Sequence, residues 1–123
     1  MALKKDVETI LSGATAPAAG ETALGDCTEL DLDAALQVEI EVQVTYGATA
    51  TAGVVARVWA AASTGEYTTA PIDEYALPFG AGATMRISFQ TRASPRFMKV
   101  TVQNEDPAVA ATGVSVTATV QTA

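Results

Sequence analysis

Residues 38–46 read Val-Glu-Ile-Glu-Val-Gln-Val-Thr-Tyr, with an apolar side chain at every second position. Polar side chains fill the positions between, and two of them are glutamates. Successive side chains of a strand point to opposite faces, so this alternation predicts a strand with one face on a core and the other in solvent. We expect a central antiparallel strand whose core face holds Val38, Ile40, Val42, Val44 and Tyr46.

Segments on both sides of this strand keep the same period of two. Before it, Leu30 and Leu32 alternate with acidic residues, and after it a Gly-Ala-Thr turn leads to further apolar segments. These segments are residues 54–61, 72–79, 85–90, 97–103 and 114–120. About seven short strands separated by turn signals predict an all-β fold, an antiparallel β-sandwich of jelly-roll or immunoglobulin-like type.

The N-terminal segment has a different pattern. Four apolar residues, Leu3, Val7, Ile10 and Leu11, follow the spacing i, i+4, i+7 and i+8, which predicts one stripe of a short amphipathic helix. An extended arm that pairs with a neighbouring molecule is the alternative. Residues 12–25 are small residues with Gly and Pro, typical of a linker. We therefore expect an N-terminal arm and flexible linker at 1–25 and a β-sandwich domain at 26–123.

The residue types argue against catalysis. The chain has no histidine, which removes the usual general base near neutral pH and the common zinc sites. Asp31 and Asp33 share a strand face and could hold calcium, or they could form a solvated acidic edge that deters strand pairing. The adjacent acids Glu105 and Asp106 are expected to be solvated in a loop. We expect no catalytic, cofactor-binding or metal-binding residues, and no cofactor.

The cysteine content and the absence of targeting signals indicate where the chain is made. Cys27 is the single cysteine, so no disulfide can form within the chain, and we expect it to be a small buried residue. Acidic residues follow Lys4 and Lys5 with no apolar run behind them, which does not fit a secretory signal. No apolar stretch has the length of a membrane span. Synthesis in the cytoplasm is the expectation.

Charge is separated along the chain, with a net value of −7. From Asp6 to Glu41 all charged residues are acidic, whereas the charged residues between Glu74 and Glu105 are all basic. The net charge argues against nucleic acid as a partner. The basic residues could be ordinary solvated positions or a docking patch for an acidic protein surface. Our interface hypothesis gives the affinity to the apolar N-terminal residues and the orientation to basic residues; its members are Leu3, Val7, Ile10, Leu11, Arg86, Arg92, Arg96 and Lys99.

The C-terminal half contains PIDEYALPFGAGATMRISFQTRASPRFMKVTVQNEDPAVAATGVSVTATV, residues 71–120. This stretch resembles small structural proteins of tailed bacteriophages, either head decoration or tail-associated proteins. Such proteins carry a strand of the type Arg-Phe-Met-Lys-Val-Thr-Val, an Asn-x-Asp loop and a terminal Val-Ser-Val-Thr strand, which correspond here to residues 96–102, 104–106 and 114–117. The resemblance implies a virion protein made in the host cytoplasm.

These observations favour a non-enzymatic virion structural protein, a homo-oligomer whose partners are its own copies and other virion proteins, with neither nucleic acid nor membrane as a partner. The alternative is a carbohydrate-binding or adhesin-type β-sandwich recognition module. That alternative requires an exposed aromatic platform, for which Trp59, Tyr67 and Tyr75 are the candidates, although Trp59 can equally be a core residue. A small enzyme is the third hypothesis.

Overall fold

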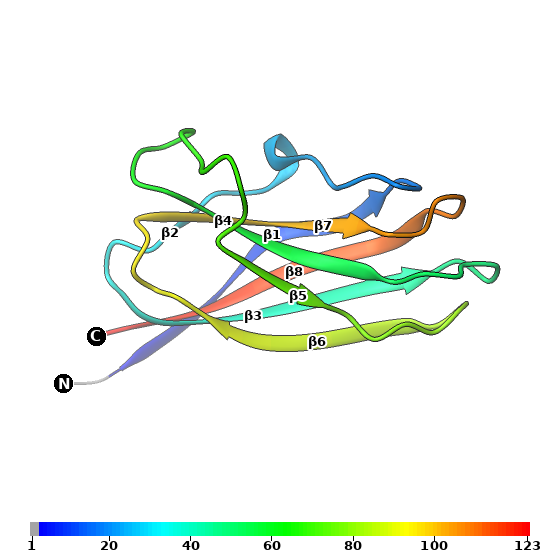
Figure 1. Cartoon of the computed structure of the whole chain (residues 1–123). Helices are drawn as coiled ribbons and strands as arrows, with labels where there is room; N and C mark the ends of the chain where they lie inside the picture. The colour runs from blue at the N-terminus through cyan, green and yellow to red at the C-terminus, as the bar shows by residue number, and fades with distance from the viewer. Residues whose placement is uncertain (1–2) are drawn as a thin grey trace.

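The computed structural model describes residues 3–123 and contains two four-stranded antiparallel sheets packed as a sandwich (Figure 1). Sheet A has the strand order β1-β8-β3-β6, and sheet B has the order β2-β7-β4-β5. The strands are β1 (Lys4–Ala16), β2 (Leu30–Asp31), β3 (Ala35–Tyr46), β4 (Val54–Ala61), β5 (Asp73–Ala76), β6 (Thr84–Thr91), β7 (Phe97–Asn104) and β8 (Ala111–Thr122). The predicted antiparallel β-sandwich is confirmed, with eight strands where about seven were expected.

Helical structure is minimal in the part of the chain that the structure describes. It consists of one 3-10 turn, η1 (Leu24–Asp26). Within residues 3–123, no helix has the length and apolar character needed to cross a bilayer.

Strand β3 has the register that its sequence predicts. The five apolar side chains of its core face are 0 to 3 % exposed. The strand lies between β8 and β6, and Val42 pairs with Val116 on one side and with Ile87 on the other. Neighbouring strands therefore cover both edges of β3, while sheet B covers its apolar face.

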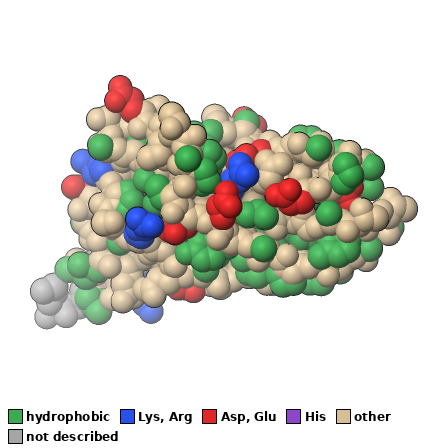
Figure 2. All heavy atoms as spheres, in the orientation of Figure 1, with side chains coloured by type: hydrophobic (Ala, Val, Ile, Leu, Met, Phe, Trp, Pro, Cys, Tyr) green, Lys and Arg blue, Asp and Glu red, His purple; other side chains and the backbone are tan. Residues whose placement is uncertain are grey.

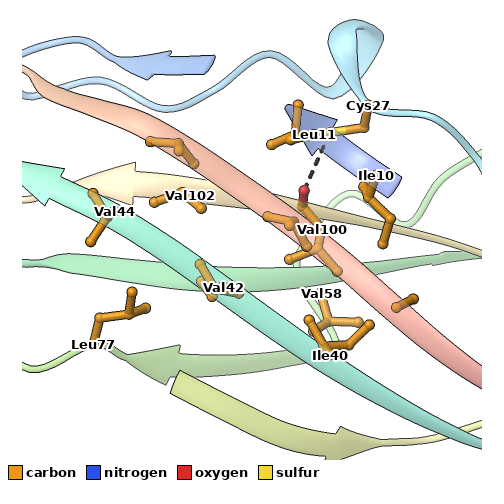
Figure 3. Close-up of a cluster of buried hydrophobic side chains, with 14 of the residues drawn as sticks. Ile10, Leu11, Cys27, Ile40, Val42, Val44, Val58, Leu77, Val100 and Val102 are labelled. Carbon is orange, nitrogen blue, oxygen red and sulfur yellow. Dashed lines mark hydrogen bonds between the residues drawn. The ribbon is translucent and has the colours of Figure 1, made fainter. Parts of the chain in front are cut away.

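The core between the sheets is built mainly from valine. Val58 of β4 and Val100 and Val102 of β7 are fully buried and face the side chains of β3 (Figure 3). Each such side chain contributes roughly 1.5–3 kcal/mol when fully buried. Branched side chains at alternating positions suit this arrangement, because they are stiff and fill the space above a pleated sheet.

The predicted helix at residues 3–11 is wrong, because this segment begins β1, the edge strand of sheet A. It runs antiparallel to β8, with Lys4 opposite Thr122 and Ala16 opposite Ala111. The prediction that residues 1–25 serve as an arm toward a neighbouring molecule stays a prediction, and residues 1–2 lie outside the described residues.

Irregular pairing explains why β1 resembles a helix in sequence. The β1–β8 register shifts between Thr9 and Leu11, and both Ile10 and Leu11 are buried. A bulge inserts an extra residue into one strand, so two consecutive side chains can turn toward the core. A second shift follows at Gly13, whose φ of +62° is a conformation that glycine adopts at little cost. Apolar residues at spacings of three and four therefore arise here from a bulged strand.

Residues 17–25 connect β1 to the edge of sheet B. Thr22 donates its backbone N–H to Val102 O at 3.0 Å, and its hydroxyl accepts the N–H of Val102 at 2.9 Å. Asn104 donates its N–H to Gly20 O at 2.7 Å. This segment thus continues the line of β2 along the free edge of β7 and covers the backbone groups of that edge.

The strands define two ends of the molecule. Lys4 of β1 and Ala35 of β3 both pair with Thr122, so the start of β1, the start of β3 and the end of β8 lie together at what we call the terminal end (Figure 1). The opposite end, called the tip, is formed by the loops at residues 17–20, 47–53, 78–83 and 105–110. Tyr46 pairs with Ala111 at the tip.

Candidate assembly surfaces

The apolar stripe of the interface hypothesis is divided by the structure. Ile10 and Leu11 are 2 % and 4 % exposed and belong to the core of their own chain. Leu3 and Val7 are 60 % and 71 % exposed. Of the four residues, Leu3 and Val7 are therefore the two available to a partner.

Leu36 adds a third exposed apolar side chain that sequence reasoning missed. It lies at the start of β3, where the pairing with β8 shifts between Ala35 and Gln37, and it is 54 % exposed. Because Ala35 and Lys4 flank Thr122, Leu36 lies at the same end of sheet A as Leu3. One sequence signal could have identified Leu36 as exposed: it lies before the regular alternation of residues 38–46 begins.

The basic residues of the hypothesis do not form one patch, and three of them pair with acids within the chain. On the face drawn in Figure 2, the Lys and Arg side chains lie apart from one another. The Arg96 guanidinium binds Asp31, with its Nε 3.1 Å from Oδ1, and lies 3.8 Å from Asp33. This hydrogen bond lowers the pKa of Asp31. Arg86 is 3.7 Å from Glu41, and its guanidinium also donates to the side chain of Gln43.

Arg92 and Lys99 lie in different surroundings. Arg92 is 3.4 Å from Asp73 of β5. Lys99 donates to Leu24 O at 3.0 Å, and its ammonium lies 5.2 Å from the centre of the Tyr67 ring. The acid-only and base-only stretches of the sequence therefore meet partly inside one molecule, as in the pair of Arg96 and Asp31.

A groove of about 260 Å³ at the terminal end is lined by four carboxylates, Asp6, Glu8, Asp31 and Asp33. The Asp31 carboxylate already accepts hydrogen bonds from Arg96 and from the backbone N–H of Asp33 at 3.0 Å. Within residues 3–123, no three or more His, Cys, Asp or Glu side chains are grouped so as to hold a metal ion. The calcium alternative for Asp31 and Asp33 gains no support from this geometry.

Trp59 lies on the outer face of sheet B and is half-buried there. Its indole N–H donates to the Thr101 hydroxyl at 2.8 Å, and that hydroxyl donates to Glu21. Glu21 also accepts from Arg57 at 3.1 Å. A groove of about 390 Å³ runs beside Trp59 between residues 21–24 and Thr68. The polar edge of the indole is therefore engaged within the chain.

The two candidate tyrosines are likewise held by their own chain. The Tyr67 hydroxyl donates a hydrogen bond to Glu29 at 2.6 Å. Burial is the main cause that raises the pKa of Tyr67, and this hydrogen bond is the second. Tyr75 stacks on Phe89, with ring centres 3.9 Å apart and planes 14° apart. Neither ring forms an isolated exposed platform.

Cys27 is buried, as expected. Its thiol donates to Val100 O at 3.3 Å (Figure 3). Burial raises the pKa of Cys27 to about 11. A thiol with this pKa is almost entirely protonated near neutral pH and is therefore a poor nucleophile.

Asp106 departs from the expectation of a solvated loop acid, because it is 1 % exposed and anchors the tip. Its carboxylate accepts the backbone N–H groups of Thr51 at 2.6 Å and Ala52 at 3.1 Å in one loop, and those of Ala108 and Val109, each at 2.9 Å, in another. The hydrogen bonds from Thr51, Ala108 and Val109 hold the pKa of Asp106 well below its usual range. One carboxylate thus joins the β3–β4 and β7–β8 loops.

Asn104 forms further hydrogen bonds that hold the same loops together. Its amide group donates to Ala16 O at 3.3 Å and to Val109 O at 2.9 Å, while its side-chain oxygen accepts the N–H of Asp106 at 3.0 Å. The Asn-x-Asp sequence at 104–106 is therefore a structural clamp.

Phe79 is the exposed aromatic side chain of the tip, with 42 % of its surface accessible. Its ring meets the Tyr46 ring edge to face at a centre distance of 5.1 Å. The Tyr46 hydroxyl in turn accepts the N–H of Val54 at 3.3 Å. Sequence reasoning placed Phe79 among the alternating residues of a strand, but β5 ends at Ala76, and Phe79 follows Leu77 and Pro78 in a loop.

No protein-family model and no curated protein matches this chain. Two solved structures are similar to this chain. One is a protein of the Bacillus endospore appendages, a family of disulfide-linked pili; it matches with a TM-score of 0.50 and 17 % identity over 98 % of this chain and 89 % of that chain. The other is the SPBc2 prophage-derived protein YomS, with a TM-score of 0.49 and 13 % identity over 99 % and 96 % of the two chains. At 17 % identity the likeness to the pilus protein concerns the fold alone.

Proposed function

We propose that this chain is a non-enzymatic structural subunit of a tailed-bacteriophage virion, a head decoration or tail-associated protein that assembles with its own copies and with other virion proteins. The observation that carries the proposal is where its large apolar side chains are exposed. Leu3, Val7 and Leu36 lie toward the terminal end and Phe79 lies at the tip. A subunit with neighbours in both directions needs apolar contacts at both ends.

The sides of the molecule contrast with its ends. The outer face of sheet A presents Glu39, Glu41, Ser88 and Gln90, all exposed. Ser88 donates to Glu39 at 2.7 Å. A polar, partly acidic face of this kind favours contact with water and discourages lateral association.

The likeness in fold to a protein of disulfide-linked pili, over 98 % of this chain and 89 % of that chain, supports assembly into a larger structure. Disulfide linkage is not part of the proposal. A chain of subunits linked by disulfides needs at least two cysteines in each subunit, whereas this sequence contains only Cys27, which is buried. The resemblance of residues 71–120 to tailed-phage structural proteins is the reason for proposing that this larger structure is a virion.

Self-association is tested by light scattering after size-exclusion chromatography across a range of concentrations. We expect assemblies that lose stability when Leu3→Gln and Val7→Gln are combined, since both changes remove exposed apolar surface without altering charge. Ser88→Gln, an exposed position on β6 at the opposite edge of sheet A, is the control and should assemble normally. A native protein that stays monomeric at every concentration contradicts the proposal.

The virion location is tested on purified particles from a host that produces this chain. We expect peptides of the chain in the particle fraction after density-gradient purification, and antibody labelling at a fixed place on the head or tail in electron micrographs. If the chain is present in the lysate but absent from the particles, the proposed virion location is wrong.

A carbohydrate-binding module is the second candidate, and the groove beside Trp59 is the observation that favours it. Trp59 offers apolar surface, and Glu21 and Thr68 offer polar groups in the same groove. A glycan array separates the two functions. Glycan binding that Trp59→Ala abolishes, by a protein that stays monomeric, would favour recognition over assembly.

A further inference from the structure

The terminal end carries a further groove, with a volume of about 600 Å³. Its floor is the run Ala60–Ala62 at the end of β4. Glu66, Tyr67 and Thr68 line one side, and the β6–β7 turn lines the other with Ser94, Pro95 and Arg96. Ala60 and Ala62 have small side chains, which leave open the space that larger side chains would fill.

Backbone hydrogen bonds hold both walls in place. Thr68 donates its N–H to Ala60 O at 2.9 Å, and Tyr67 pairs with Ala61 as an isolated bridge. On the other side, Leu32 donates its N–H to Arg96 O at 2.8 Å. The groove is therefore preformed, and a ligand that enters it does not first have to order its walls.

The tip is equally rigid. Glu105 donates its N–H to Gly53 O at 3.0 Å, and Gly82 donates its N–H to Gly47 O at 3.0 Å. Together with the Asp106 clamp, these bonds join three loops around Phe79 and fix the direction in which its ring projects. A rigid, projecting aromatic side chain is the type of residue that dominates binding energy at interfaces.

The two surfaces match in chemistry. Phe79 is the one aromatic side chain that is exposed within residues 3–123, and the groove combines an alanine floor with the ring of Tyr67. Over the four tip loops, Glu105 is the only exposed charge. Arg96 and Glu66 line the groove, so its charges are of both signs, and Arg96 is already paired with Asp31 of its own chain. A tip with so little charge can enter an apolar groove without burying unpaired ions.

We infer that the tip of one copy docks in the groove of the next copy, with Phe79 inserted against Ala60–Ala62 and Tyr67. The inference rests on the proposed function and names the two surfaces through which the copies join. The surfaces differ and lie at opposite ends, since β4 begins beside Tyr46 at the tip and ends at the groove. A contact between unlike surfaces continues from copy to copy and gives an open, head-to-tail chain.

A mixing experiment tests this contact. Phe79→Glu removes the tip anchor and leaves the groove, whereas Ala62→Arg with Thr68→Arg fills the groove and leaves the tip; all three positions are exposed, so the fold should persist. We expect each variant to be monomeric alone by light scattering, and the equimolar mixture to give a one-to-one heterodimer. Gln90→Glu on the outer face of sheet A is the control and should polymerise like the native chain.

Cross-linking provides a readout that does not depend on lost assembly. In a Cys27→Ser background, Phe79→Cys combined with Ala62→Cys should yield a ladder of disulfide-linked oligomers on non-reducing gels. Either single cysteine variant should give no ladder. Efficient dimers from Phe79→Cys alone would indicate a symmetric tip-to-tip contact and overturn the inference.

The outcomes separate this inference from the proposed function. If the native chain never associates, both fail. If the native chain assembles and Phe79→Glu assembles just as well, the head-to-tail contact is wrong while the structural function stands. A mixture of the two variants that remains monomeric also rejects the contact.

Discussion

Asp106 and Glu105 are adjacent in the chain, yet one is buried among four backbone N–H groups and the other is exposed. The two residues differ in whether the carboxylate accepts hydrogen bonds from backbone N–H groups. Loops 47–53 and 105–110 leave N–H groups without strand partners, and a buried N–H group without an acceptor destabilises the fold. The Asp106 carboxylate supplies the acceptor for both loops, so we assign it a structural role.

Replacing Asp106 with Asn should lower the melting temperature by several degrees and weaken its dependence on acid pH. Asp106 has a folded-state pKa far below its unfolded value near 4, so its stabilisation is complete above about pH 5 and is lost progressively as the pH falls below that. Thermal melts from pH 2 to 7 should show a steeper acid decline for the native protein than for Asp106→Asn. Glu105→Gln is the control and should keep the native slope; equal slopes for all three proteins would contradict the assignment.

Cys27 should be unreactive in the folded protein and reactive after unfolding. Its pKa of about 11 leaves little thiolate at pH 8, and burial also blocks access. We expect slow alkylation by iodoacetamide in buffer and rapid alkylation in denaturant, followed by mass spectrometry. Cys27→Ser should leave assembly intact. A native thiol that reacts as fast as the unfolded one would show that the residue is accessible.

At the scale of elements, the alternation in β3 was sufficient to predict its register, because a strand with partners on both edges and a core on one face follows the period of two without interruption. β1 could not be predicted in the same way. Its bulges break the period, and the resulting spacing imitates a helix. The bulges depend on the pairing with β8, which lies at the other end of the sequence, and the local pattern does not contain that information.

Strand β1 has one apolar side chain that is buried, Ile10, and one that is exposed, Val7, and this difference tests its register. Ile10→Asp should destabilise the fold by about 3 kcal/mol or more, since it places an unpaired carboxylate in the core. Val7→Asp, the matched change on the exposed side chain, should leave the free energy of unfolding within about 0.5 kcal/mol of the native value. Urea denaturation measures both. Similar losses for the two variants would mean that the β1 register is wrong.

At the scale of the whole molecule, the separation of charge along the sequence does not become a separation in space. Arg96 and Arg86 reach acids from the first third of the chain, so part of the expected attraction between copies is used within each copy. These pairs are exposed, and each contributes about 0–1 kcal/mol. The candidate surfaces were predictable only in part: Leu3 and Val7 were identified, but Leu36, Phe79 and the alanine groove depend on loop geometry that the sequence pattern does not encode.

Arg92→Glu combined with Arg96→Glu should weaken assembly mainly at low salt. Both residues lie on the β6–β7 turn at the terminal end, and at about 0.1 M salt the attraction between exposed charges is largely screened beyond roughly 10 Å. Sedimentation velocity at low and at high salt measures the effect. The control is Arg86→Glu, which is placed away from this turn on β6. A loss of assembly that persists unchanged at high salt would point to damage to the groove itself.

The long ladder between β1 and β8 also has a mechanical consequence. Lys4 and Thr122 are partners at one end of the ladder, so a pull that separates these two residues would open the pairing one step at a time. Tension applied from the tip to the terminal end runs along the strands and loads many hydrogen bonds at once in shear. In a head-to-tail fibre the tension would follow this second direction, in which the sandwich is strongest.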